Sequence, residues 1–65
     1  MNLVERTWLY ILLKHGIHAS RIDAAEYNPR SDLVRVDYYV TSTDRVLTKF
    51  FSPKEVMDAL WMLSV

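Results

Sequence analysis

The chain has 65 residues, one glycine, two prolines and no cysteine, and its eight basic side chains balance its eight acidic ones. The absence of cysteine excludes a disulfide scaffold, a thiolate zinc site and a cysteine nucleophile, and a hydrophobic content of 51% excludes a disordered chain. The sequence has no apolar run of the roughly 20 residues that span a membrane, and it has no basic region where a signal peptide would carry one. We therefore expect one cytoplasmic domain over residues 1–65, with no membrane contact.

The first helix is predicted over residues 3–15. Asn2 is a suitable N-cap, and Glu5 follows three residues later, as in a capping box. Gly16 can adopt the left-handed conformation that ends a helix, and Ile17 can then contact the last turn. The helix therefore has a start signal and a stop signal at a suitable distance.

Three strands are predicted next, over residues 21–27, 33–41 and 45–51. The segment 28–32 has the composition of a turn, and the segment 42–44 is expected to be a three-residue hairpin loop. Such short loops favour an antiparallel meander. With these loop lengths the predicted cross-strand pairs are Ile22–Tyr38, Ala24–Val36, Val36–Phe50, Asp37–Lys49 and Val40–Val46.

This register sorts the side chains of the sheet onto two faces. The face predicted to lie under the helices carries Ile22, Ala24, Val34, Val36, Tyr38, Val40, Val46 and Phe50. The face predicted to meet solvent carries apolar residues between charged ones: Tyr27, Leu33, Tyr39, Leu47 and Phe51, with Arg21, Asp23, Arg35, Asp37 and Lys49. Several apolar side chains on one open face indicate a contact site.

The second helix is predicted to begin after Ser52, which is a good N-cap. Pro53 suits the first helical position, and Glu55 completes a capping box. The apolar residues of this helix fall on one stripe: Val56, Ala59, Leu60 and Leu63. The sequence thus predicts an α+β fold, a two-layer α-β-β-β-α domain in which both helices cover one face of a three-stranded antiparallel meander.

This order of elements resembles that of the double-stranded-RNA-binding domain. The similarity includes a leucine-rich first helix that ends in Lys14-His15-Gly16 and a second helix opened by a serine cap, Ser52. The lysine cluster that the family carries at the start of its second helix is absent, because Lys54 stands there beside Glu55 and hydrophobic residues follow. The resemblance therefore implies the topology and no RNA-binding residue.

Candidate catalytic groups are sparse. His15 and His18 could form a metal pair or an acid–base pair, but Gly16 lies between them, and we favour a helix-end cation and a loop residue. Asp23 and Asp37 could be paired carboxylates on the open face, or members of a solvated charge lattice, which we favour. With no glycine-rich phosphate loop and no metal motif in the sequence, we expect a protein that is not an enzyme and takes no cofactor.

The apolar content exceeds what a lone two-layer domain of this length can cover, which indicates a protein-interaction module. We expect a homodimer whose interface contains Tyr10, Met57, Trp61 and Met62. A protein partner would bind the sheet face through Tyr39, Leu47, Phe51, Leu33, Tyr27 and Arg35. Such a module would act as an adaptor or inhibitor, of the kind that viruses and mobile elements encode, by occupying a surface of a larger protein.

Nucleic-acid binding stays open as an alternative, to double-stranded RNA or to a single strand, through the open sheet face or the second helix. Aromatic side chains on that face could stack on bases while Arg21, Arg35 and Lys49 contact the phosphate backbone. Asp23 and Asp37 lie in the same patch and would repel phosphate. A nucleic-acid partner is therefore the less favoured of the two.

Overall fold

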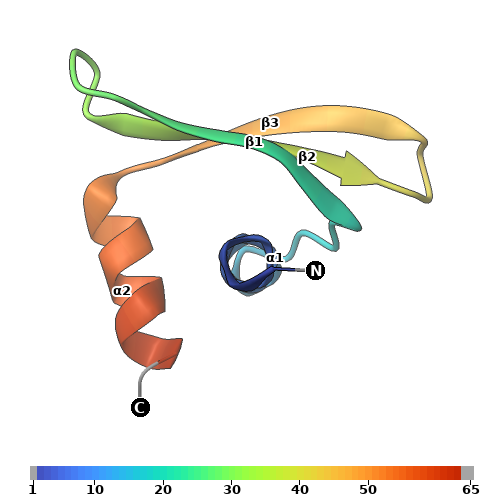
Figure 1. The fold of residues 1–65 in the computed structure, drawn as a ribbon, viewed down its shortest axis with the longest axis horizontal. Helices are drawn as coiled ribbons and strands as arrows, with labels where there is room; N and C mark the ends of the chain where they lie inside the picture. The colour runs from blue at the N-terminus through green and yellow to red at the C-terminus, as the bar shows by residue number, and fades with distance from the viewer. Residues whose placement is uncertain (1, 64–65) are drawn as a thin grey trace.

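The computed structural model describes residues 2–63. It contains α1 (Leu3–Lys14), β1 (Arg21–Asn28), β2 (Leu33–Val40), β3 (Arg45–Phe51) and α2 (Pro53–Leu63). The strands form one antiparallel sheet in the order β1-β2-β3, and both helices lie on the same side of it (Figure 1). The predicted α+β fold and its α-β-β-β-α order are confirmed. Within the described residues, no helix has the length and hydropathy needed to cross a membrane.

Asn2 and Gly16 end α1 as predicted, but the Glu5 carboxylate bonds β1 and does not complete the predicted capping box. Asn2 Oδ1 accepts a hydrogen bond from the amide of Glu5 at 2.7 Å. At the other end Gly16 has a φ of 77°, and the amide of Ile17 donates to a carbonyl of the last turn at 3.0 Å, which is the pattern of a Schellman end. The Glu5 carboxylate accepts a hydrogen bond from the amide of Ile22 at 3.1 Å, so it joins the start of α1 to β1.

The register of β3 against β2 differs from the prediction by one residue. The predicted pairs Val36–Phe50, Asp37–Lys49 and Val40–Val46 are replaced by Val36–Lys49, Asp37–Thr48 and Val40–Arg45. The cause is the hairpin loop, which has four residues, 41–44, rather than three. Its last residue, Asp44, has a φ of 51°, a left-handed conformation that aspartate adopts more readily than most residues.

This shift exchanges the two faces of β3, because a one-residue slip moves every side chain of a strand to the other face. Phe51 is completely buried on the helix side, whereas Val46 and Phe50 are 51% and 56% exposed. The placement of Phe51 on the open face and of Val46 and Phe50 in the core was therefore wrong. Leu47 moves with Phe51 to the helix side of the sheet, opposite Tyr38.

β1 begins in the predicted register and then departs from it. Beyond Ile22 a bulge shifts the register by one residue, and Asp23 is the additional residue. The predicted pair Ile22–Tyr38 is confirmed, and the predicted pair Ala24–Val36 is replaced by Ala24–Asp37 and Ala25–Val36. The strand continues one residue further than predicted, to Asn28.

The two hairpin loops have the same construction. Each has four residues and ends in an aspartate of positive φ, 55° at Asp32 and 51° at Asp44. Each aspartate accepts a hydrogen bond from a tyrosine five residues earlier, from Tyr27 Oη at 2.7 Å and from Tyr39 Oη at 2.6 Å. These bonds favour the neutral phenols and raise the pKa of both tyrosines. The spacing Tyr-x4-Asp therefore marks both loops.

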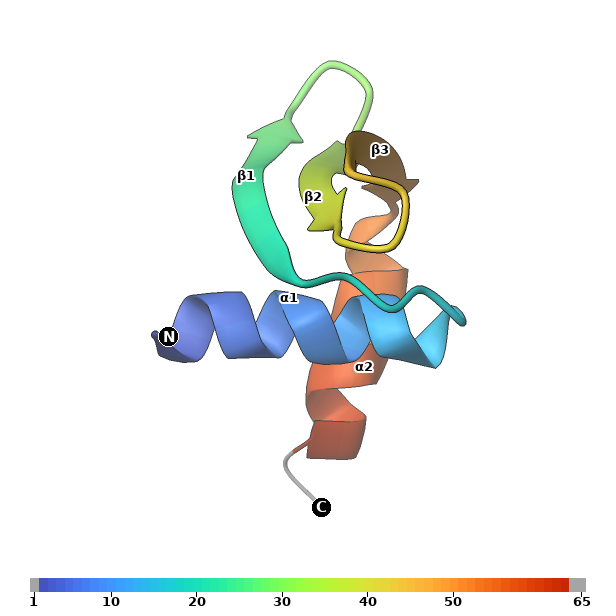
Figure 2. The same ribbon diagram turned by 90° about the vertical axis from the view of Figure 1, so that its right-hand side faces the viewer.

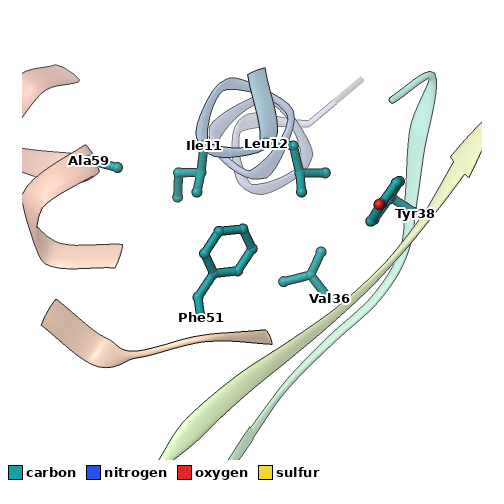
Figure 3. Packing of buried hydrophobic residues seen from close by; sticks show 6 residues of the cluster. All are labelled: Ile11, Leu12, Val36, Tyr38, Phe51 and Ala59. Atoms are coloured by element: carbon teal, nitrogen blue, oxygen red, sulfur yellow. The ribbon is translucent and has the colours of Figure 1, made fainter. Parts of the chain in front are cut away.

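The hydrophobic core is small, and Phe51 lies at its centre (Figure 3). Its members are Ile11, Leu12, Val36, Tyr38, Phe51 and Ala59. The ring centroid of Phe51 is 6.0 Å from that of Trp8 and 5.0 Å from that of His15. Side chains of α1, of the sheet and of α2 thus pack together around this ring. Its full burial stabilises the fold by about 2–3 kcal/mol.

α2 extends away from the sheet. It crosses α1 and points away from the strands (Figure 2). Of the residues that the structure describes in α2, Ala59 alone is buried. The chain exposes 4800 Å² and has a radius of gyration of 11.6 Å, where a compact monomer of this size would have about 4300 Å² and about 10.7 Å. The molecule is therefore less compact than a chain of its length can be, as an uncovered helix requires.

Candidate protein-interaction surfaces

Apolar side chains line an open cleft where α1 and α2 diverge. Its walls are formed by Leu3, Arg6 and Thr7 of α1 and by Leu60 and Leu63 of α2, and its volume is about 440 Å³. A neighbouring hollow of about 250 Å³ shares three of these residues and also exposes Val4. The two spaces form one surface, which we call the interhelical cleft, with four exposed apolar side chains: Leu3, Val4, Leu60 and Leu63.

Two larger side chains of α2 continue this surface. Met57 and Trp61 stand one helical turn apart, so they lie on the same side of the helix, and they are 64% and 71% exposed. Met62 is also exposed, about 100° further around the helix than Trp61. The three residues of α2 that were predicted at a dimer interface are therefore accessible, and Met62 faces a different direction from the other two.

Tyr10, the fourth residue predicted at a dimer interface, lies elsewhere. It is half-buried and lines a hollow with Leu9, Leu13 and the segment 17–19. The ammonium group of Lys14 lies 5.3 Å from the centre of its ring. Tyr10 therefore belongs to the side of α1 that carries the following loop, and the residues of α2 are not among those that line this hollow.

The open face of the sheet carries paired charges at its β1 edge. Arg21 Nε donates to Asp23 Oδ1 at 2.8 Å, and the guanidinium lies 4.2 Å from the ring centre of Tyr39. The hydrogen bond from Arg21 to Asp23 raises the pKa of the arginine further. The phenol of Tyr39 is in turn held by Asp44, so this end of the face has a fixed arrangement.

A second group of charges lies along the middle of the same face. Arg35 Nη2 donates to Glu26 Oε2 at 2.9 Å, and Arg35 Nε is 3.7 Å from Asp37 Oδ2. Thr48 Oγ1 donates to Asp37 Oδ1 at 2.7 Å. Asp23 and Asp37 thus each lie beside an arginine, as a charge lattice requires, although Lys49 is on the other face.

Three of the six residues predicted to bind a partner lie on the open face: Leu33, Arg35 and Tyr39. Phe51 is buried in the core and cannot contact a partner. Leu47 lies on the helix side, where it is 41% exposed. Tyr27 pairs with Val34 on the helix side and is more than half exposed. At the end of the hairpin it nevertheless lines a hollow of about 390 Å³ together with Leu33 and Arg35.

The predicted site residues leave out several exposed apolar positions, among them Leu3 and Val4 at the start of α1. Val46 and Phe50 occupy the open face in place of Leu47 and Phe51, and the repeated Tyr-x4-Asp spacing was the signal for the longer loop that puts them there. Leu60 and Leu63 share the predicted apolar stripe of α2 with Val56 and Ala59, but only Val56 and Ala59 pack on the core, and both leucines are exposed. No local signal in the sequence reports where α2 crosses α1.

The candidate catalytic groups do not converge. His15 Nε2 is 3.9 Å from Glu55 Oε2, and its ring contacts Phe51 edge-on. His18 lines the hollow beside Tyr10. Among residues 2–63, no three His, Asp or Glu side chains are grouped so that they could hold a metal ion. The contacts of His15 are those of a helix-end side chain that packs on the core.

Comparisons with protein-family models, curated proteins and solved structures found no match for this chain.

Proposed function

We propose that this protein is a non-enzymatic interaction module that forms a homodimer through its helices and acts as an adaptor or inhibitor by occupying a surface of a larger protein. The observation that carries this proposal is the exposure of α2. An eleven-residue helix buries only Ala59, while Met57, Leu60 and Trp61 remain in solvent.

The interhelical cleft and the neighbouring side of α2 carry exposed apolar side chains of the kind that a dimer interface buries. A standard interface covers about 800 Å² of each partner, which is about a sixth of the 4800 Å² that this chain exposes. A two-fold axis makes the same patch meet itself, so one apolar surface is enough for both subunits. Burial of Trp61 would supply the aromatic anchor that is typical of such interfaces.

The dimer is tested by sedimentation velocity at micromolar concentration. We expect the chain to sediment at twice its monomer mass, and the double substitution Met57→Ser and Trp61→Ser to give a monomer with unchanged far-ultraviolet circular dichroism. The matched control is Phe50→Ser, which removes a similarly exposed aromatic side chain from the open face and should leave the dimer intact. A wild-type monomer would contradict the dimer.

The open sheet face favours a protein partner over nucleic acid. Its two arginines already pair with Asp23, Glu26 and Asp37, so little positive charge is left for phosphates. Binding to phosphate would weaken steeply with salt. An electrophoretic shift of duplex RNA or of a single strand at low salt, lost at physiological salt, would favour the alternative instead.

A further inference from the structure

The two edges of the sheet differ in how they are protected. β1 has a bulge at Asp23, and the amide of Ile22 is occupied by the Glu5 carboxylate of α1; both features prevent pairing with another strand. β3 runs for seven residues, Arg45–Phe51, with continuous pairing to β2. Within the described chain its outer side pairs with no strand. The free edge of β3 is therefore the side at which this sheet can be extended.

The backbone of β3 presents regularly spaced groups at this edge. The amide of Ser20 donates to the carbonyl of Tyr39 at 2.8 Å, so the backbone of Tyr39 faces β1. Backbone groups alternate in direction along an antiparallel strand, so Tyr38 faces β3, and its partner Leu47 faces β2. The amides and carbonyls of the residues between these pairs point outward: Val46, Thr48 and Phe50.

The side chains of this edge strand are sorted by charge. Arg45 and Lys49 lie on the helix side with Leu47 between them, and the open-face side carries Val46, Thr48 and Phe50. If two copies paired through β3 about Thr48, the four cations would come together on one face. Like charges at neighbouring cross-strand positions are destabilising, and basic residues on an edge strand are a known means of preventing self-pairing.

We propose that the free edge of β3 binds an extended segment of a partner protein by strand addition, and that this segment carries acidic residues on the face that meets Arg45 and Lys49 and apolar residues on the face that meets Val46 and Phe50. This inference rests on the proposed function, because it identifies the surface and the partner chemistry of the same module. The outward backbone groups of Thr48 and its neighbours provide main-chain hydrogen bonds, and the two cations provide the selectivity.

The test uses synthetic peptides as probes and the full chain as the receptor. The first peptide alternates glutamate and valine over nine residues, and the second has lysine in place of each glutamate. We expect the acidic peptide to bind at least about tenfold more tightly than the basic one in a fluorescence titration, since two cross-strand ion pairs are exchanged for two repulsions.

Thr48→Pro tests the main-chain contribution. Its amide points outward, so proline removes a donor to the peptide and no hydrogen bond to β2, which is the position in which an edge strand accepts proline. The matched control is Thr48→Val, which keeps the amide and also loses the hydrogen bond to Asp37. We expect Thr48→Pro to abolish peptide binding and Thr48→Val to retain it.

A charge reversal, Arg45→Glu with Lys49→Glu, leaves the backbone unchanged and should make the chain prefer the basic peptide. The proposal is overturned if the acidic peptide does not bind, if both peptides bind equally, or if Thr48→Pro binds as well as Thr48→Val. It is also overturned in favour of self-pairing if Thr48→Pro converts a dimer to a monomer while Met57→Ser with Trp61→Ser does not. If the chain is a dimer but does not bind the acidic peptide, the strand addition is contradicted and the proposed helix interface is not.

Discussion

α1 and α2 are both amphipathic helices with clear start signals, yet only one of them is covered. α1 buries Ile11 and Leu12 completely and is joined to the sheet by Glu5. α2 buries Ala59 and leaves its larger apolar side chains in solvent. An amphipathic pattern thus tells which face of a helix avoids water and does not tell what will cover it. In this protein α1 belongs to the core, and the exposed side of α2 is available for the proposed interface.

The largest expected effect is a difference in the free energy of unfolding between two variants, each with one leucine of one helix replaced by alanine. Leu12→Ala removes a completely buried side chain and should lower the free energy of unfolding by about 3 kcal/mol. Leu60→Ala removes a side chain that is 38% exposed and should cost less than about 1 kcal/mol in dilute protein, where the monomer prevails. Urea unfolding followed by circular dichroism measures both. Equal losses would mean that α2 is as much a part of the core as α1.

Amide hydrogen exchange sharpens the comparison without any substitution. α2 makes few buried contacts, so its amides should exchange through local opening at least about tenfold faster than those of α1 in dilute protein. At high concentration the dimer should protect α2 and leave α1 unchanged. The monomeric variant Met57→Ser with Trp61→Ser is the control, because its α2 should stay fast at every concentration. If amide exchange in α2 of the wild type did not change with protein concentration, α2 would not be part of a dimer interface.

The smallest expected effect is a pH dependence of the stability of the sheet, which should leave the association through α2 unchanged. The hydrogen bond to Asp44 raises the folded-state pKa of Tyr39 above its ordinary value of 10.0, so this bond stabilises the fold at neutral pH. Its contribution is complete below the pKa of the unfolded chain, and it is lost as the pH rises through the higher pKa of the folded state. Thermal unfolding of Tyr39→Phe should therefore be less sensitive to pH above about 10 than that of the wild type.

Dimer mass at the same alkaline pH is the matching control. Tyr39 lies on the sheet face and the proposed interface lies on the helices, so titration of this phenol should weaken the hairpin and leave association unchanged. A dimer that dissociates in step with the titration, and does so less in Tyr39→Phe, would show that the sheet face contributes to association.

Element order was predictable because each helix end has its own chemistry. Asn2, Gly16 and Ser52 all cap the ends at which the sequence places them. The register was not predictable from apolar alternation, because it depends on a loop whose last residue, Asp44, takes a left-handed conformation and extends the turn by one residue. A local pattern of hydrophobic residues fits either face of a strand, and loop length decides between them.

The candidate surfaces divide in the same way. The positions of Met57 and Trp61 around the helix place them beside the apolar stripe that packs on the core, and both are exposed. The exposure of Leu60 and Leu63 depends on where α2 crosses α1, which is a property of the whole packing arrangement. Half of the predicted sheet-face residues were misplaced for one reason only, the register shifts in β1 and β3.

Two phenylalanines stand next to each other at the end of β3, and Phe51 is the one in the core while Phe50 meets solvent. A shift of β3 by one residue against β2 would turn the strand over, so that Phe50 would face the helices and Phe51 the solvent. The same shift would bring Leu47 and Lys49 to the face that Val46, Thr48 and Phe50 now occupy. An aromatic ring would thus face the interior in either register, and the pairing of one strand decides which side chains this protein presents on its open face.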